Sequence, residues 1–309
     1  MARRLHMKFA LVNQQRQEAQ PELLGQCPSC GHPMVAKCGE VKIWHWAHQG
    51  KRSCDPWWEN ETEWHRKWKA QFPDAWQEVV HRANDGTKHI ADVKTDRGWV
   101  IEFQHSYLKP EERRSREDFY PKLIWVVDGM RRKKDSAQLL QTWDESVQVA
   151  QNLPLRRVLS ANGALLRDWA GGSTPVFFDF AEQPVLWWLF AKNTDSPVYI
   201  APYQRTAFID CHSRNDTEKS RQFGELVNNI PKLIEDYESH LRTQAPRPDP
   251  LQIMSRRGRG VDPFPWTVFR LRPVISSPSS ILPPKGGLPP QAADVLLSSG
   301  LSAHGHARS

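Results

Sequence analysis

The placement of the cysteines is the feature that most restricts how this chain can fold. Four of the five, Cys27, Cys30, Cys38 and Cys54, fall within 28 positions, and Cys211 lies far from them. An odd count, clustering toward one end and the lack of a secretion signal disfavour a disulfide framework. Metal ligation is the better interpretation, so we expect a small metal-binding module at the N-terminal end.

The spacing within this module suits a tetrahedral zinc site. Cys27 and Cys30 have the C-x2-C spacing that lets two thiolates bind one ion from a tight turn, and His45 and His48 follow. We therefore favour Cys27, Cys30, His45 and His48 as ligands of a structural Zn²⁺. Cys54 is the residue best placed to replace one of the histidines. Reduced structural cysteines beside incidental histidines are the alternative interpretation.

Composition divides the 309 residues into four expected regions. The zinc module covers residues 1–55, a mixed α/β core covers 56–150, and an accessory region of strands and helix covers 151–245. Residues 246–309 hold 11 of the 24 prolines, and we expect this tail to be disordered. Most of the net charge of +7 also lies in the tail, so bulk charge is weak support for nucleic-acid binding by the body.

The sequence gives no sign of a membrane segment. No apolar run approaches the roughly 18 residues that a membrane span needs. The first fifteen residues contain a four-residue apolar stretch, which is too short for a signal peptide. We therefore expect a cytoplasmic protein without a membrane partner.

Hydrophobic periodicity predicts the elements of the core. Trp64, Trp68 and Phe72 recur at four-residue spacing, as on the buried face of a helix. Residues 123–127 (LIWVV) are apolar throughout, as in an interior strand. The expected helices are residues 59–72 and 109–119, and the expected strands are 88–95, 99–106, 123–127, 175–180, 185–190, 198–201 and 206–211.

Two acidic residues lie on the expected hairpin of strands 88–95 and 99–106. If Asp92 and Glu102 pair across the hairpin, their carboxylates come within reach of one Mg²⁺ or Mn²⁺, ions that prefer oxygen ligands. Gln104 points to the same face as Glu102 because side chains alternate along a strand. Such an ion could polarise a phosphodiester and lower the pKa of an attacking water. A solvated strand face is the alternative.

The order of these motifs resembles the competence protein CoiA-like family of the PD-(D/E)XK nuclease superfamily. The resemblance covers about residues 27–128, with Gln104 in place of the usual lysine and His89 where the family often has arginine. The matching segments are 27–30 (CPSC), 45–48 (HWAH), 61–65 (ETEWH), 91–93 (ADV), 101–106 (IEFQHS), 116–120 (REDFY) and 124–127 (IWVV).

This resemblance implies a restriction-endonuclease-like fold, in which a mixed sheet is flanked by helices, with the zinc module in front and a strand-containing extension behind. It implies Asp92 and Glu102 as ligands of Mg²⁺ or Mn²⁺, and Gln104 in the place of the lysine that orients the attacking water. Glu61 would complete the site, with His65 one helical turn further along.

The implied function is metal-dependent hydrolysis of DNA, in DNA uptake, recombination or mobile-element processing, with other DNA-processing proteins as partners. The alternative is a non-catalytic zinc-containing DNA-binding or adaptor protein on a nuclease-like fold. Basic residues near the site could neutralise phosphates, although solvated helix faces would look the same. These residues are Arg66, Lys67, Lys69, Arg113, Arg114, Arg116 and 131–134 (RRKK).

Overall fold

The computed structural model describes most of the chain from residue 6 to residue 244. The described residues are 6–50, 54–57, 59, 61–150, 153–158, 163–181, 183–191, 197–212 and 217–244. The tail that we expect to be disordered lies outside them. Contacts divide the chain into one unit that contains Met1–Val227 and another that begins at Asn228, and both sites described below lie in the first.

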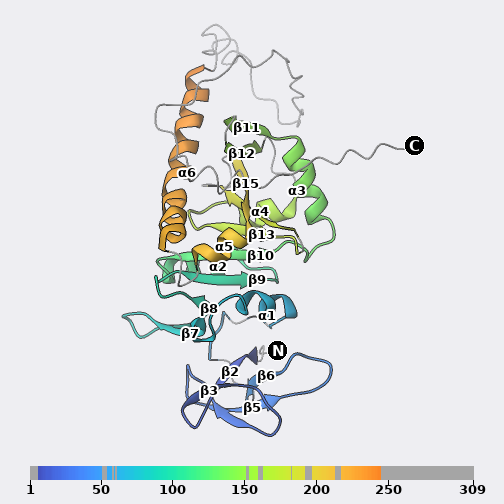
Figure 1. Cartoon of the computed structure of the whole chain (residues 1–309), viewed down its shortest axis with the longest axis vertical. Helices are drawn as coiled ribbons and strands as arrows, with labels where there is room; N and C mark the ends of the chain where they lie inside the picture. Colours follow the sequence, from blue (N-terminus) through green and yellow to red (C-terminus); the bar gives the residue numbers. More distant parts are fainter. Residues whose placement is uncertain are drawn as a thin grey trace, which may run out of the picture. The chain divides into compact units, whose positions relative to one another are not determined.

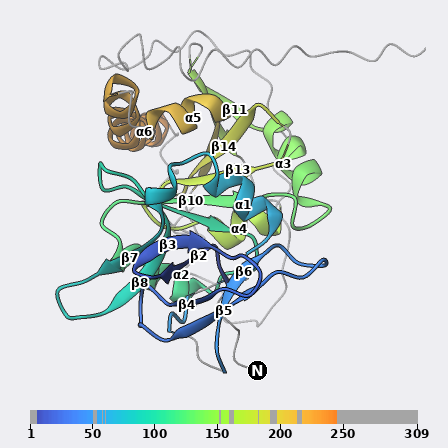
Figure 2. The same cartoon turned by 60° about the horizontal axis from the view of Figure 1, so that its bottom comes forward.

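Six strands at the N-terminal end form an antiparallel sheet in the order β1-β6-β5-β4-β2-β3 (Figure 2, blue). Met7, Met34 and Trp46 are fully buried in its small core. The strands are β1 (His6–Met7), β2 (Phe9–Val12), β3 (Gln15–Glu18), β4 (Leu24–Gln26), β5 (Pro33–Lys37) and β6 (His45–His48). The H-x2-H pair thus lies at the two ends of strand β6.

A second, nine-stranded sheet has the order β11-β12-β15-β14-β13-β10-β9-β8-β7 (Figure 1). Strand β10 pairs in parallel with β9 and β13, and the other neighbouring strands of this sheet pair antiparallel. All six residues of β10 are buried, which confirms the expected interior strand. The strands are β7 (Gln77–Arg82), β8 (Lys88–Lys94), β9 (Val100–Gln104), β10 (Leu123–Asp128), β11 (Val147–Ala150), β12 (Leu153–Val158), β13 (Val176–Asp179), β14 (Val185–Phe190) and β15 (Val198–Gln204).

Helices flank this sheet and make the fold mixed α/β, as expected. The sheet also continues across the expected boundary between residues 150 and 151, because β12 to β15 extend it. The helices are α1 (Glu63–Lys69), the 3-10 turn η1 (Asp74–Trp76), α2 (Pro110–Phe119), α3 (Asp135–Asp144), α4 (Ala164–Trp169), α5 (Arg205–Cys211) and α6 (Thr217–Gln244). Among the described residues, no helix is both long and apolar enough to cross a bilayer.

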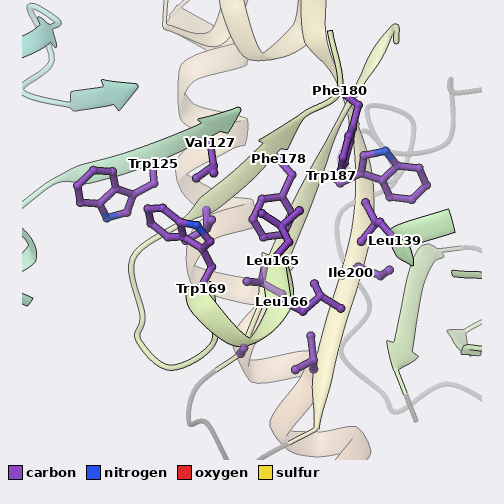
Figure 3. Close-up of a cluster of buried hydrophobic side chains, with 14 of the residues drawn as sticks. Trp125, Val127, Leu139, Leu165, Leu166, Trp169, Phe178, Phe180, Trp187 and Ile200 are labelled. Carbon is purple, nitrogen blue, oxygen red and sulfur yellow. The ribbon is translucent and has the colours of Figure 1, made fainter. Parts of the chain in front are cut away.

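Large apolar side chains fill the space between the sheet and helices α3 and α4 (Figure 3). Trp125 from β10 packs against Trp169 from α4, with ring centroids 5.4 Å apart. Leu139 from α3 and Phe178 from β13 belong to the same buried cluster. Burial of aromatic side chains of this size contributes much of the stability of a core.

The opposite face of the sheet carries a second aromatic group, which holds α1 and α5 in place. Trp68 of α1 stacks on Phe103 of β9, with ring centroids 5.6 Å apart. Phe208 of α5 packs against Phe177 of β13 at 5.0 Å. Asp179 accepts hydrogen bonds from the indoles of Trp64 (2.8 Å) and Trp68 (2.7 Å), so β13 also holds α1.

Two expected elements differ from the structure. Helix α1 is shorter than residues 59–72, because Thr62 forms a capping box with His65 at its start and Pro73 follows soon after its end. Residues 206–211, expected as a strand, belong to helix α5. Phe208 and Cys211 are its buried residues, and their three-residue spacing fits a helix rather than the alternation of a strand.

Candidate metal centres

Four possible metal ligands meet beside the N-terminal sheet. The ligand atoms of Cys27, Cys30, His48 and Cys54 all lie within 4.8 Å of one another. The sulfurs of Cys27 and Cys54 are 3.7 Å apart, and His48 Nε2 is 3.3 Å from the sulfur of Cys30. We call these four residues the Cys/His cluster.

The geometry of the Cys/His cluster fits a tetrahedral zinc ion. Zinc–sulfur bonds of about 2.3 Å place two tetrahedral sulfur ligands roughly 3.8 Å apart, close to the separation of Cys27 and Cys54. A hydrogen bond with Cys54 lowers the pKa of Cys27 to about 5, so the thiolate form of Cys27 is favoured near neutral pH. Three sulfurs and one imidazole nitrogen are a ligand set that zinc accepts.

The predicted ligand His45 does not belong to the cluster, and Cys54 takes its place. Nδ1 of His45 lies 2.9 Å from the carbonyl oxygen of Ile43, and its ring stacks on His6 with centroids 4.0 Å apart. The reason is geometric: neighbouring positions along a strand point to opposite faces, so two histidines three positions apart diverge. Cys54, which we expected to be the residue best placed to replace one of the histidines, is therefore the fourth member of the cluster.

Asp92 and Glu102 lie side by side where strands β8 and β9 separate. Their ladder ends at the pair Val93 and Ile101, one position before these two carboxylates. From there, the side chains replace the main-chain bonds. The amide of Phe103 donates to Asp92 (3.0 Å), and the amide of Asp92 makes a long contact with Glu102 (3.4 Å). The side chains of Asp92 and Glu102 thus meet across the hairpin, although the strand ladder itself stops one position earlier.

This separation of the strands opens a pocket, which we call the carboxylate pocket. It receives side chains from β8, β9, α1, α2 and the segment that precedes α1. Its lining residues are Trp57, Glu59, Glu61, His65, Lys69, Ile90, Asp92, Glu102, Phe103, Gln104 and Arg116. Four carboxylates face two permanent cations in this set, an excess of negative charge that a divalent cation would offset.

The pKa values of Asp92 and Glu102 are both raised, as expected for two buried carboxylates that lie close together. Burial and the neighbouring Asp92 raise the pKa of Glu102 to about 8, although Arg116 acts in the opposite direction. Desolvation likewise raises the pKa of Asp92. Two carboxylates held this close are difficult to ionise together without a compensating charge. They are therefore suited to hold a hard cation through oxygen ligands.

Lys69 is a pocket residue that the sequence placed among surface basic groups. It is 1% exposed and makes ion pairs with Glu61 and Glu78, the latter at 2.8 Å. Burial alone would lower the pKa of Lys69, but Glu78, Glu61 and Asp92 outweigh that effect and raise it. The pocket thus holds a permanent ammonium group near the carboxylate of Asp92.

Glu61 lies in the pocket, as the resemblance implied, but just before helix α1 rather than on it. Its side chain is 2% exposed and accepts a hydrogen bond from Arg66 Nε (2.8 Å). Both ring nitrogens of His65 already have hydrogen-bond partners, an arrangement that does not suit a general base. Nε2 of His65 faces the carbonyl of Phe103 (3.0 Å), and Nδ1 faces the amide of Thr62 (3.2 Å).

Burial lowers the pKa of His65 to about 4, so this imidazole is neutral near pH 7. A neutral ring that donates from Nε2 and accepts at Nδ1 satisfies both contacts at once. His65 therefore joins the start of α1 to β9, which positions Glu61 and Lys69.

Gln104 is buried in the pocket and is already engaged by its neighbours. Its amide nitrogen donates to Glu59 (2.7 Å) and to the carbonyl of Ser106 (3.1 Å). Glu59, which the sequence interpretation missed, also accepts from the amide of Ser106 (2.5 Å). Gln104 thus fixes Glu59 at the wall of the pocket.

Several of the expected basic residues are buried in ion pairs instead of facing solvent. Arg116 donates to Glu102 (3.1 Å), and Arg113 donates to Glu117 (2.8 Å). These two guanidiniums stabilise the pocket and helix α2, and they are not surface phosphate contacts. The exposed basic side chains of the three clusters are Lys67, Arg114, Lys133 and Lys134.

A comparison with known proteins finds a family match for the N-terminal part of the chain. Residues 14–56 match the family model described as Competence protein CoiA, N-terminal domain. All four residues of the Cys/His cluster fall in this match, whereas Asp92 and Glu102 lie outside it. Neither the curated proteins nor the solved structures show a significant match to the chain. Residues 14–56 are therefore similar to the N-terminal domain of competence protein CoiA.

Proposed function

We propose that this protein is a Mg²⁺- or Mn²⁺-dependent nuclease that hydrolyses DNA phosphodiester bonds, on a core of restriction-endonuclease-like type. The observation that carries the proposal is the adjacent pair Asp92 and Glu102, with raised pKa values at the point where two strands separate. Ordinary main-chain hydrogen bonds could join the two strands at this point without two buried carboxylates. A cation-binding role explains why they stand together.

In this proposal Asp92 and Glu102 hold the cation, with Glu61 at the same side of the pocket. When bound, the divalent cation supplies Lewis acidity and lowers the pKa of a water molecule. Arg116 orients Glu102 through their hydrogen bond (3.1 Å). Asp92 is only partly buried as a residue, and we place the approach of a phosphate at this end of the pocket.

Lys69, rather than Gln104, takes the part of the lysine in the superfamily motif. Its ammonium group is permanently charged and is held in place by Glu61 and Glu78, whereas the side chain of Gln104 is a neutral amide bound to Glu59 and Ser106. Lys69 can therefore orient a water molecule and stabilise negative charge that develops on a phosphate. We assign a structural Zn²⁺ to the Cys/His cluster, because its four ligands leave no open position.

Incubation of the purified protein with linear and circular DNA, in Mg²⁺, Mn²⁺ or EDTA, tests this function. We expect shortened linear DNA or relaxed and linearised circles with either cation, and intact DNA in EDTA. Cleavage of closed circles would identify endonuclease action. DNA binding without any metal-dependent change in length would favour the adaptor function instead. We place this activity in the cytoplasm, in DNA uptake, recombination or mobile-element processing, and the similarity to a competence-protein domain supports the link to DNA uptake.

A further inference from the structure

The segment from Cys54 to Glu59 connects the Cys/His cluster to the carboxylate pocket. Cys54 is a member of the cluster, and Trp57 and Glu59 line the pocket. Asp55 lies between them and is 2% exposed. We call Cys54, Asp55, Trp57 and Glu59 the bridging residues. The two candidate metal centres are therefore joined by a short piece of chain.

Asp55 holds the strand that carries Asp92. Its carboxylate accepts hydrogen bonds from the amide of Ile90 (2.7 Å), from the amide of Trp57 (3.0 Å) and from Nδ1 of His89 (2.9 Å). His89 and Ile90 belong to β8 and lie three and two positions before Asp92 in that strand. A carboxylate that receives three buried donors fixes their position strongly.

Trp57 and Glu59 hold the other side of the pocket. The ring of Trp57 stacks on His89, with centroids 3.2 Å apart and planes at 11°. Its carbonyl accepts from Arg116, the residue that also binds Glu102. Glu59 accepts from Gln104 and from the amides of His105 (3.4 Å) and Ser106.

A second contact ties the cluster to the same strand. Lys88, the first residue of β8, donates from Nζ to the carbonyl of Ser29 at 2.5 Å. Ser29 lies between Cys27 and Cys30, inside the turn that supplies two of the four ligands. The start of β8 thus contacts both parts of the Cys/His cluster, the turn and the segment after Cys54.

We propose that metal binding at the Cys/His cluster assembles the carboxylate pocket. An ion that holds Cys54 fixes the bridging residues, and these set the positions of Asp92, Glu102 and Gln104. Occupancy of the cluster therefore raises the affinity of the pocket for a divalent cation, and the coupling is reciprocal. The part of this inference that concerns the divalent cation rests on the proposed function.

The test compares the zinc-loaded protein with the same protein after zinc removal by a chelator and dialysis. Hydrogen exchange is followed at the amides of Ile90, His105 and Ser106, which donate to Asp55 or Glu59. Mn²⁺ affinity is measured by electron paramagnetic resonance. We expect zinc removal to speed exchange at these three amides and to weaken Mn²⁺ binding at least tenfold. Exchange in β10 and β13 should stay slow.

The variant Asp55→Asn separates the link from the ion, with Glu40→Gln as a matched control on an exposed carboxylate of the same module. Asp55→Asn should keep its zinc, measured by elemental analysis, and still bind Mn²⁺ at least tenfold more weakly. Glu40→Gln should keep both. Because Asp55→Asn could fold poorly, the exchange measurement on the wild-type protein stands as an independent test.

Unchanged exchange at Ile90, His105 and Ser106 after zinc removal would overturn the proposal. Faster exchange throughout β10 and β13 would also overturn it, because it would indicate general unfolding instead of a local link. Mn²⁺ affinity that is equal with and without zinc would refute the coupling and leave the proposed function standing. A wild-type protein that binds no Mn²⁺ would refute the proposed function, and the exchange rates would still decide the structural link.

Discussion

The Cys/His cluster and the carboxylate pocket are built in different ways. Three of the four cluster residues come from a tight turn and an adjacent strand of one small sheet, and the family match covers them all. The pocket is lined from two strands, two helices and the segment before α1. Sequence spacing can reveal a site made by local geometry, but a site made by long-range packing shows only fragments in the sequence.

The two sites also differ in what they can do chemically. Three thiols and one imidazole complete a tetrahedron, so the cluster offers stability and no open position for a substrate. The pocket holds four carboxylates against Lys69 and Arg116, and Asp92 is only partly buried as a residue. An excess of oxygen ligands beside a fixed cation suits chemistry on a phosphate. Substitutions at the two sites should therefore have different consequences.

The combined change Cys27→Ser and Cys30→Ser should remove the zinc and unfold the N-terminal sheet. Zinc binding contributes about 10–16 kcal/mol of apparent free energy in zinc-finger peptides. The removal of two of the four ligands should abolish that stabilisation. Elemental analysis and thermal unfolding measure the effect. Cys38→Ser, which changes a cysteine outside the cluster, should retain one zinc per chain. A double variant that keeps its zinc would remove the distinction between the two sites.

Lys69→Met should lower the single-turnover rate of DNA cleavage by about 100-fold or more, because it removes a positioned cation from the pocket. It should also reduce stability by about 3–5 kcal/mol, since Glu61 and Glu78 lose their buried partner. Lys67→Met on the exposed side of α1 is the matched control and should change neither quantity much. A Lys69→Met protein that is destabilised but cuts at the wild-type rate would make Lys69 purely structural.

Mn²⁺ binding should weaken as the pH falls below about 8. Burial and Asp92 raise the pKa of Glu102 to about 8, so a proton competes with the cation below that pH. Displacement of one proton changes the apparent affinity roughly tenfold per pH unit. Without metal, the stability contributed by the raised pKa is present at low pH and is lost as the pH rises through 8. Mn²⁺ should then raise the melting temperature more at pH 8 than at pH 6, and an equal effect would contradict the assignment.

Gln104 variants should have the smallest effect. Gln104→Ala removes the donor that holds Glu59, and we expect the cleavage rate to fall several-fold, less than for Lys69→Met. Gln104→Lys can still donate to Glu59 and restores the commoner form of the motif, so it should retain or raise activity. Rates of all three variants under one condition decide between the residues. A larger loss for Gln104→Ala than for Lys69→Met would assign the water-orienting part to Gln104.

Much of the strand pattern could be predicted from the sequence, because alternation and uniform apolarity are direct consequences of burial. The paired carboxylates of Asp92 and Glu102 followed from the hairpin in the same way. The start of helix α1 and the helical state of residues 206–211 could not, since the capping box of Thr62 and tertiary packing determine them. Lys69 was missed because a lysine on a helix normally faces solvent, whereas here ion pairs with Glu61 and Glu78 stabilise its charge inside the pocket.

The contacts that link the two sites were also invisible in the sequence. Asp55 follows a cysteine in a segment with no periodic pattern, and its partners His89 and Ile90 are more than thirty positions away. Nothing in the local sequence distinguishes Asp179 from other strand residues, although it accepts hydrogen bonds from the indoles of Trp64 and Trp68. Such long-range hydrogen bonds depend on the register of whole elements, which no local motif records.

The most direct measurement of the central claim is DNA cleavage by Asp92→Asn and Glu102→Gln proteins in Mg²⁺ and Mn²⁺. Each change keeps the shape of the side chain but removes a charge that the cation needs. Glu111→Gln, on an exposed carboxylate of α2, is the control, with circular dichroism as the check of folding. We predict no detectable cleavage by either pocket variant, near wild-type cleavage by Glu111→Gln, and none by any protein in EDTA. Wild-type activity that persists in EDTA, or folded Asp92→Asn protein that cuts at the wild-type rate, would contradict the account.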